Sequence, residues 1–363
     1  MSATYRVAII GTGRMGGLID DELPAGSWSK PYGHFSAYAA IPATEVVAVA
    51  NRGKERLERF ANRFGITNTY LDYREMILKE RPDVVSITTP SLARAEPIIF
   101  CAEQGVRGIY AEKGLCASLE EADRIVSAVK RHNVAFNWGA MRRHHDGFKK
   151  LRDEIAGGAI GKPLFAVHTY ATDLIKHHPH TIDLVAMMLG DPKPEWVEGR
   201  LIEPGDPLAP NRPLPTFDRA RHRFVPPEGR EIGDPWVGFF RVHYQDEMEG
   251  VFIPVPGRFE IDVHGSEGRA YAWDNGGVFR VHKTNGKTGR TDEIGFQPTG
   301  ESPTICTIRN LIREIETGER TDGNIDRTMQ VVEVQFALAH SHISDGARVP
   351  VPVTDRSLYI PGG

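Results

Sequence analysis

The glycine-rich run after the first apolar segment constrains the fold of this chain most. Residues 5–10, Tyr-Arg-Val-Ala-Ile-Ile, have the composition of a buried strand and lead directly into a G-x-G-x-x-G run. In such a run the first glycine permits a tight turn, the second lets the backbone approach a pyrophosphate, and the third permits close packing of a following helix. The N-terminus of that helix offers amide donors to a phosphate. Rather than an ordinary glycine turn, we predict a dinucleotide-binding turn formed by Gly11, Thr12, Gly13, Arg14, Met15 and Gly16.

The end of the second apolar run bears on the choice between NAD and NADP. Residues 45–50 end at Asn51-Arg52, where NAD-specific folds usually carry an acid that binds the ribose 2′-hydroxyl. Asn51 can still bond that hydroxyl, while Arg52 offers a planar cation to a 2′-phosphate. Alternatively, Arg52 is solvated and NAD is used. We expect both residues to contact the cofactor, NADP or NAD.

Residues 18–31 lengthen the usual spacing between a glycine turn and the second strand. The segment contains Pro24, Gly26, Ser27 and Pro31, which favour a loop. We expect this insertion to cap the cofactor or to contact a neighbouring subunit.

The order of strand and helix patterns predicts two domains. Strands and helices alternate as far as residue 138, which demands a mostly parallel sheet. After about residue 163 the pattern changes to successive β-rich runs, which favour an antiparallel sheet. We predict an α/β protein, with a Rossmann NAD(P)-binding domain over residues 1–138. Residues 139–363 are predicted to form an α+β domain with a large, mostly antiparallel sheet, for substrate binding and oligomerisation. Within it, residues 203–235 are rich in Pro, Gly, Arg and Asp and predict a long surface excursion.

Composition excludes several classes of partner. The chain has 363 residues, 40% of them hydrophobic and 25% charged, as expected for a globular protein in water. A net charge of −4 leaves no electrostatic footprint for nucleic acid, and no apolar run approaches the roughly 18 residues of a membrane span. Three cysteines cannot all pair, and only four residues precede the first strand. We therefore expect reduced thiols and a cytoplasmic location.

The segment that follows residues 109–111 carries the candidate chemistry. Open α/β sheets bind ligands beyond the carboxyl ends of their strands, and Glu112-Lys113-Gly114 stands at such an end. Hydride transfer between nicotinamide and a carbinol carbon needs a group that moves the hydroxyl proton. Beside the positive nicotinamide ring, Lys113 would have a lowered pKa and would hydrogen-bond that oxygen. Glu112 would orient the lysine or the nicotinamide ribose. The alternative for Lys113 is a solvated charge at a helix cap.

Four motifs together resemble those of the Gfo/Idh/MocA oxidoreductase family, and the resemblance runs from end to end. They are the glycine turn, Thr88-Thr89-Pro90-Ser91, Ala111-Glu112-Lys113-Gly114 in place of the family's Glu-Lys-Pro, and His180-Thr181-Ile182-Asp183 in place of its His-x-x-Asp. The resemblance implies oxidation or reduction of one carbinol or carbonyl of a sugar, inositol or polyol with bound NAD(P). A minority of the family use the nicotinamide transiently to cleave glycosides.

The resemblance also assigns roles to residues. It implies that Thr89 and Pro90 contact the cofactor and that His180 shares proton transfer with Lys113. Asp183 would fix His180 or a helix N-terminus at the substrate site. A structural role for His180 is the alternative, since His177-His178-Pro179-His180 also has the composition of a surface run.

Departures from the family pattern affect the expected substrate. Four residues before its histidine the family usually has an aspartate that joins in proton transfer, and here that position is Lys176. Arg94 stands where the family often has histidine, and Gly114 replaces proline. Lys176 would act as a second acid or bind an anionic substrate group.

Further cations could complete an anion-binding pocket. Arg142 and Arg143 follow residues 135–138, where the family has a loop at the substrate cleft. With Lys176 and His177 they would bind a carboxylate, phosphate or sulfonate on a sugar. The alternative is a solvated helix start. We expect no metal site, because the histidines at 177, 178 and 180 lack i, i+4 spacing and no acid or cysteine partners them nearby.

The sequence therefore predicts an NAD(P)-dependent oxidoreductase acting on a sugar, sugar derivative or polyol, with Lys113, His180 and Lys176 in proton chemistry. One alternative is an NAD-dependent glycoside hydrolase that works by transient oxidation, elimination and re-reduction, including on a sulfonated or carboxylated glycoside. Another is a non-catalytic NAD(P)-binding sensor. We expect a homo-oligomer formed through the C-terminal sheet.

Overall fold

The chain divides into two compact units in the computed structural model, which describes residues 4–255, 259–284, 288 and 291–362. Unit 1 comprises residues 1–116, 120–144 and 301–329, and unit 2 comprises 117–119, 145–300 and 330–363. Residues 301–329 thus belong with the first unit, although the sequence places them in the second domain. The reason is an apolar helix in this segment, described below.

A parallel sheet forms the centre of unit 1, as predicted. Its strand order is β3-β2-β1-β4-β5-β6. This order reverses between β1 and β4, and open sheets of this kind bind ligands in the crevice at that point. The strands are β1 Tyr5–Ile10, β2 Thr44–Ala50, β3 Thr69–Tyr70, β4 Val84–Ile87, β5 Gly108–Ala111 and β6 Ala135–Trp138.

The helices between these strands follow the predicted periodicity. Gly65 ends α2 in the left-handed conformation, at φ +69°, which costs glycine little. Asp72 caps α3 by accepting a hydrogen bond from the Arg74 amide at 2.8 Å. The helical segments of unit 1 are η1 Leu18–Asp21, α1 His34–Ala39, α2 Lys54–Phe64, α3 Tyr73–Glu80, η2 Ser91–Ala93, α4 Ala95–Glu103, α5 Leu119–Arg131, η3 Met141–His144 and α8 Pro303–Thr317.

The helix predicted directly after the glycine turn is wrong. Only the short 3₁₀ turn η1 follows Gly16, and α1 begins at His34. The backbone N–H groups of His34 and Phe35 donate to the carbonyls of Met15 and Gly16, at 3.0 and 2.9 Å. The residues between Gly16 and His34 therefore form a loop. The start of α1 is hydrogen-bonded to the end of the glycine turn, where a continuous helix would have followed. Two adjacent glycines and the prolines of the loop explain why no helix forms in between.

The insertion is held within unit 1. Asp20 closes its base by accepting from the backbone N–H groups of Tyr32 and Gly33, at 2.7 and 3.1 Å. Ser302, the N-cap of α8, donates its hydroxyl to the Pro31 carbonyl at 2.6 Å. The insertion therefore contacts the beginning of α8.

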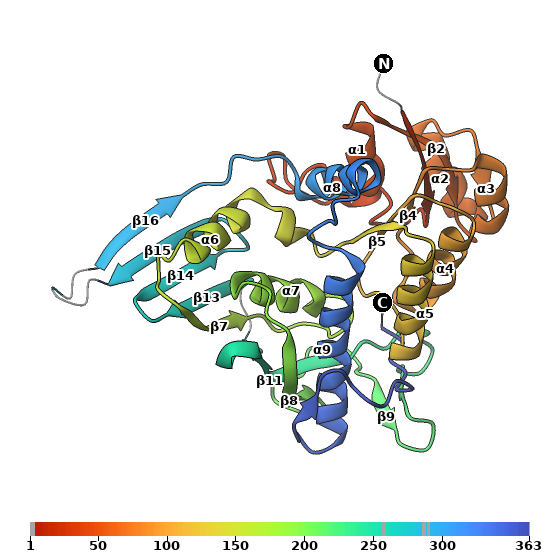
Figure 1. Ribbon diagram of the computed structural model, residues 1–363. Helices are drawn as coiled ribbons and strands as arrows, with labels where there is room; N and C mark the ends of the chain where they lie inside the picture. Colours follow the sequence, from red (N-terminus) through yellow and green to blue (C-terminus); the bar gives the residue numbers. More distant parts are fainter. Residues whose placement is uncertain (1–3, 256–258, 285–287, 289–290, 363) are drawn as a thin grey trace. The chain divides into compact units, whose positions relative to one another are not determined.

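α8 packs against the parallel sheet of unit 1 and lies beside α1 (Figure 1). A side chain at Gly108 would have its Cβ only 2.7 Å from Ile315, so glycine lets α8 approach β5 closely. The shared core of buried side chains consists of Tyr5, Val7, Ala37, Tyr38, Ile41, Val84, Tyr110, Ala135, Ile305, Ile308, Leu311 and Ile312. Burial of this apolar face keeps residues 301–329 in unit 1.

Unit 2 is built on a larger sheet with the order β16-β15-β14-β13-β7-β12-β11-β8-β17. Its neighbouring strands are antiparallel except β7 and β12, which confirms the mostly antiparallel sheet. The strands are β7 Pro163–Thr169, β8 Pro194–Ile202, β11 Trp236–Tyr244, β12 Met248–Ile253, β13 Glu260–Gly265, β14 Gly268–Trp273, β15 Val278–Thr284, β16 Thr291–Phe296 and β17 Val349–Pro350.

The remaining elements of unit 2 are mainly helices and one small hairpin. The predicted surface excursion contains the hairpin of β9 Thr216–Asp218 and β10 Arg223–Val225. The helical segments are α6 Asp146–Ala156, α7 His178–Met188, η4 Gln245–Glu247 and α9 Ile325–Ile343, which belongs to unit 2 from Gln330 onward.

Cys101 and Cys116 of unit 1 are buried, whereas Cys306 is half-buried. Among the described residues, no helix is long and apolar enough to span a membrane.

Candidate active site

The glycine turn at the end of β1 has the geometry expected of a phosphate-binding turn. Gly11 adopts φ +104°, and a Cβ there would stand 2.6 Å from the Thr88 hydroxyl, which donates to the Gly11 carbonyl at 2.7 Å. A Cβ at Gly16 would stand 2.5 Å from the same carbonyl. No described atom lies within 4 Å of a Cβ built on Gly13, so the backbone there is open to a ligand.

A cavity of about 850 Å³ adjoins this turn within unit 1. Its wall contains six of the residues predicted to contact the cofactor, namely Gly11, Gly13, Asn51, Arg52, Thr89 and Pro90. Further cations that the sequence analysis did not identify also line it, namely Lys54, Arg56, Arg59 and Arg74. Their positions on helices beside the strand ends give them access to the same space.

The other residues of the turn lie outside that lining. The amide of Thr12 approaches the Asn51 side-chain oxygen at 3.5 Å, and the Thr12 hydroxyl is buried with no hydrogen-bond partner among the described residues. Arg14 forms an exposed ion pair with Glu22 at 2.7 Å. The orphaned Thr12 hydroxyl fits a site that a polar ligand completes.

Glu112 and Lys113 follow the carboxyl end of β5 and are largely buried. The Lys113 Nζ lies 4.0 Å from the Glu112 Oε2, and the two side chains are 11% and 5% exposed. The alternative of a solvated cap charge for Lys113 is therefore wrong. A Cβ at Gly139 would come within 2.9 Å of the Glu112 carboxylate, so glycine at the end of β6 makes room for this group.

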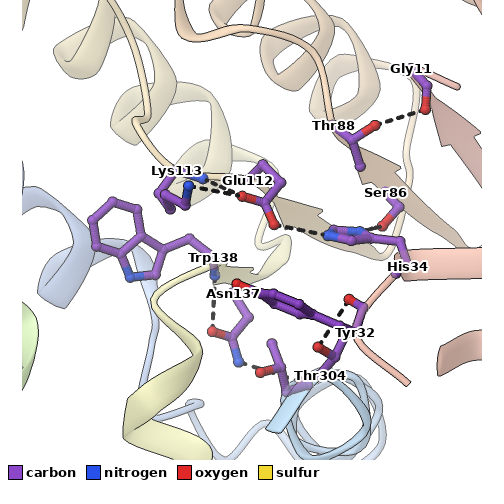
Figure 2. Close-up of polar contacts among 12 residues, drawn as sticks. Gly11, Tyr32, His34, Ser86, Thr88, Glu112, Lys113, Asn137, Trp138 and Thr304 are labelled. Atoms are coloured by element: carbon purple, nitrogen blue, oxygen red, sulfur yellow. Dashed lines mark hydrogen bonds and ion pairs between the residues drawn. The ribbon is translucent and has the colours of Figure 1, made fainter. Parts of the chain in front are cut away.

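His34 connects Glu112 to the interior of the sheet. Its Nε2 lies 3.2 Å from Glu112 Oε1 and its Nδ1 lies 2.5 Å from the Ser86 hydroxyl. The ring stacks on Tyr110, with centroids 4.1 Å apart. Figure 2 shows the Glu112 carboxylate between Lys113 and His34, with Ser86 beyond the imidazole.

Sequence reasoning missed His34 because the insertion separates it from the glycine turn. One signal was present in β4, where Ser86 interrupts the apolar residues of a fully buried strand. A buried hydroxyl needs a hydrogen-bond partner, so Ser86 points to an unidentified polar neighbour.

The charges around Glu112 keep it ionised. Burial opposes ionisation, but the hydrogen bond from His34 and the positive charges of Lys113 and Arg94 outweigh it and lower the pKa of Glu112. Burial lowers the pKa of Arg94 to about 10, partly opposed by Glu112. Arg94 also donates to the Thr89 carbonyl. The arginine found where the family often has histidine thus contributes positive charge beside Glu112.

Arg142 and Arg143 occupy η3, after β6. Arg143 is only 3% exposed, so the alternative of a solvated helix start is wrong for this residue. Burial, followed by the charge of Glu112, raises the pKa of Tyr32 to about 12, while Arg142 and Arg14 act in the opposite direction. The charges of Arg142 and Glu112 therefore both act on the Tyr32 hydroxyl.

In unit 2, Lys176 is exposed and lines a cavity of about 400 Å³. The other lining residues are Asp173, Arg212, Arg230, Glu231, Ile232 and Asp234. The Asp234 carboxylate accepts from the backbone N–H groups of Ile175 and Lys176, both at 2.8 Å. The arginines come from the 203–235 excursion, whose return to this site the sequence pattern did not indicate.

His177 has an acidic partner, contrary to the prediction. Its Nδ1 lies 3.0 Å from Asp173 Oδ2, four residues earlier in the chain. Asp173 also binds Arg212. The i−4 spacing was visible in the sequence, but the turn formed by residues 174–177 was not expected.

The alternative of a surface run at residues 177–180 is wrong for its later members. His178, His180 and Asp183 lie on α7 and are 2%, 6% and 1% exposed. His178 bonds the Thr181 hydroxyl at 2.8 Å, and burial lowers the pKa of His178 to about 3. These residues are packed into unit 2 instead of forming a solvated segment.

Comparison with known proteins gives a family match over the parallel-sheet part of unit 1. Residues 5–139 match the Gfo/Idh/MocA model, described as an oxidoreductase family with an NAD-binding Rossmann fold. This part of the chain is similar to that family. The Gfo/Idh/MocA assignment agrees with the strand order and with the glycine turn at the end of β1.

Two curated Gfo/Idh/MocA-like relatives match less than half of the chain. Levoglucosan dehydrogenase of Pseudarthrobacter phenanthrenivorans is 34% identical over 46% of this chain and 41% of its own length. The scyllo-inositol 2-dehydrogenase (NAD(+)) of Bacillus subtilis is 31% identical over 46% of this chain and 44% of its own. The matched region therefore spans less than half the length of these relatives.

Structural similarity extends over both units. Levoglucosan dehydrogenase in complex with NADH and L-sorbose has a TM-score of 0.77 and 21% identity, over 97% of this chain and all of the other. At this identity the match establishes the fold of the chain.

Proposed function

We propose that this protein is an NAD(P)-dependent oxidoreductase that transfers hydride between nicotinamide and a hydroxyl-bearing carbon of a sugar, sugar derivative or polyol. The buried Lys113–Glu112 pair at the carboxyl end of β5 carries this proposal. Bound nicotinamide would supply the hydride acceptor or donor. The inositol and levoglucosan dehydrogenases among its relatives support a carbohydrate substrate.

In this proposal Lys113 moves the hydroxyl proton of the substrate. A positioned acid or base of this kind accelerates a reaction by about 10²–10⁴-fold. Glu112 stays negatively charged and holds the lysine ammonium, while His34 fixes the carboxylate from its other oxygen. The sheet excludes water from both partners, which strengthens their interaction.

The residues of unit 1 fit a dinucleotide, and we propose that they favour NADP. Arg52 is exposed and lines the cavity, and no ion pair of the described residues involves it. Arg52→Ala should therefore weaken NADP binding by about ten- to a hundredfold and NAD binding little, because only NADP offers a 2′-phosphate. Arg63→Ala on α2, the helix that follows Arg52, removes an ion pair with Asp21 and is the control. Equal changes for both cofactors would reject this role of Arg52.

For unit 2 we propose that His180 and Lys176 take part in proton transfer and that Asp183 positions His180. Within unit 2, Lys176 and His177 would also bind an anionic group on the substrate. For Arg142 and Arg143 of unit 1 we propose the same kind of role. Lys176 is the most available of these cations, because it is exposed whereas His177 already contacts Asp173. An acidic sugar should therefore bind better than its neutral analogue.

We also propose that the protein forms a homo-oligomer through the sheet of unit 2. Strand register places Phe165, Arg269 and Trp273 on one face of this sheet, and the two aromatic side chains are each 37% exposed. Exposed aromatic residues of this kind are enriched in protein interfaces. Light scattering of the purified chain measures the subunit number.

The function is tested by incubating the protein with NAD or NADP and a panel of sugars, polyols and glycosides, including acidic ones. The expected result is steady accumulation of reduced nicotinamide with a free sugar or polyol. Cofactor binding without turnover of any compound would favour a sensor and reject the proposal. Cleavage of glycosides without net reduction of the cofactor would also reject it, in favour of a redox-neutral glycosidase.

A further inference from the structure

A cluster of two histidines and one aspartate lies in unit 2, and it includes none of the residues proposed above for cofactor or substrate. His222 is in the turn between β9 and β10, His340 is near the end of α9, and Asp355 is in the C-terminal tail. One ligand atom of each residue lies within 4.8 Å of those of the other two. Within the residues that the structure describes, this is the group of three whose donor atoms are close enough to share a metal ion.

The Asp355 carboxylate is oriented by its own turn. Its Oδ1 accepts from the Ser357 amide at 3.0 Å and from the Ser357 hydroxyl at 2.8 Å. Its Oδ2 lies 2.9 Å from the Nε2 of His222. That nitrogen is shielded from solvent and makes no well-aligned hydrogen bond among the described residues. A cation would use both of these side-by-side donor atoms.

His340 completes the cluster from α9. Its Nε2 lies 3.1 Å from the backbone oxygen of Asp355, so its ring is oriented on the same tail residue. Both histidines are thus brought to the same aspartate, one to its carboxylate and the other to its backbone oxygen.

We propose that His222, His340 and Asp355 bind a divalent transition-metal ion, with Zn²⁺ as the best fit. Two imidazoles and one carboxylate, completed by water, are a common tetrahedral zinc set. Mg²⁺ and Ca²⁺ prefer oxygen ligands and fit poorly. Tetrahedral zinc needs ligand atoms about 3.3 Å apart, so the side chains must close slightly on binding. Asp355 is 47% exposed and has room for this movement.

The ion would fasten the C-terminal tail to the rest of unit 2. The tail already contacts α9, where the Val353 amide donates to Glu333 at 2.9 Å, and β10, where the Phe224 amide donates to the Tyr359 carbonyl at 2.9 Å. Asp355 lies between these two attachments in the chain. A metal that binds only the folded state raises its stability.

Zinc binding is tested by equilibrium dialysis of the purified full chain against ZnCl₂, with bound metal measured by mass spectrometry. The expected result is about one ion per chain, and Asp355→Asn or His340→Ala should weaken affinity by more than about tenfold. His243→Ala is the matched control, because His243 also contacts a carboxylate, Glu249 at 2.8 Å. Zinc should raise the melting temperature of the wild type and the control only.

Failure of the wild type to retain zinc would overturn the proposal. So would equal affinity in the wild type and the Asp355→Asn variant, since the ion would then bind elsewhere. If His340→Ala does not fold, Asp355→Asn decides, because asparagine keeps an oxygen that can accept from Ser357. The visible absorption of bound Co²⁺ independently reports whether nitrogen ligands coordinate in a tetrahedral site.

Discussion

Glu112 in unit 1 and Asp234 in unit 2 are buried to the same extent but ionise differently. They are 4% and 3% exposed. The pKa of Glu112 is lowered, whereas burial raises the pKa of Asp234 to about 6 despite two backbone hydrogen bonds. Glu112 has His34 as a hydrogen-bond partner and two neighbouring cations, while Asp234 relies mainly on amide donors.

This difference shows that charged partners, and not burial alone, decide whether a buried carboxyl group is a fixed charge. Glu112 stays negative at neutral pH and therefore holds Lys113 by a permanent attraction. Asp234 takes up a proton near pH 6 and serves to clamp the backbone before α7. Substituting the two carboxyl groups, or changing the pH, should therefore affect the stability of the fold in different ways.

Neutralising Glu112 should have the largest effect on stability. Glu112→Gln leaves Lys113 and Arg94 buried without their counter-charge, which should lower the free energy of unfolding by about 3–5 kcal/mol in urea denaturation. Glu75→Gln breaks an exposed Glu–Lys pair at 2.6 Å and should cost less than about 1 kcal/mol. Similar losses in the two variants would show that Glu112 is not a fixed buried charge.

Asp234 should make stability depend on pH in the opposite direction. The pKa of this carboxyl is raised in the folded state, so its proton stabilises the fold at low pH and this contribution is lost as pH rises from about 4 through 6. Relative to Asp234→Asn, the wild type should lose about 2 kcal/mol of unfolding free energy between pH 4 and 7. Measuring both proteins at each pH cancels the other titrating groups. A difference that does not change with pH would contradict the raised pKa.

His34 should have a smaller effect. In His34→Gln the side chain can still donate to Glu112 but loses the stacking on Tyr110, so unfolding free energy should fall by about 1–3 kcal/mol. Turnover should fall with it, because Glu112 is less well held. Ser86→Ala removes the distal hydrogen bond and leaves the Glu112 contact, so it should retain more turnover. If Ser86→Ala loses as much turnover as His34→Gln, the contact with Glu112 is not what matters.

Sequence patterns predicted the parallel sheet well, because it depends on local order. Alternating elements determine the strand order, and strand order determines which strand ends carry Gly11, Thr88 and Lys113. Apolar periodicity likewise located most helices of unit 1. The pattern did not show that the glycine turn leads into a loop instead of a helix. The helix resumes only at His34, and nothing in the sequence before that residue marks where it resumes.

Contacts between distant segments were beyond sequence reasoning. α8 packs on the sheet of unit 1 through an apolar face. Such a face could equally pack on the sheet of unit 2, and nothing in residues 303–317 shows which of the two sheets it covers. The cations beside Lys176 come from a loop without periodicity. Burial of His178 and His180 could not be predicted either, since a histidine-rich segment has the same composition on a surface and in a buried helix.

The most direct test of the account is Lys113→Ala, measured for cofactor affinity and for turnover of whichever sugar or polyol the wild type accepts. We predict unchanged NAD(P) binding and a loss of turnover of about a hundredfold or more, as expected when a general acid or base is removed. Lys79→Ala, which removes the lysine of the exposed pair with Glu75, should be indistinguishable from the wild type. Near-normal turnover in Lys113→Ala would contradict the proposed mechanism.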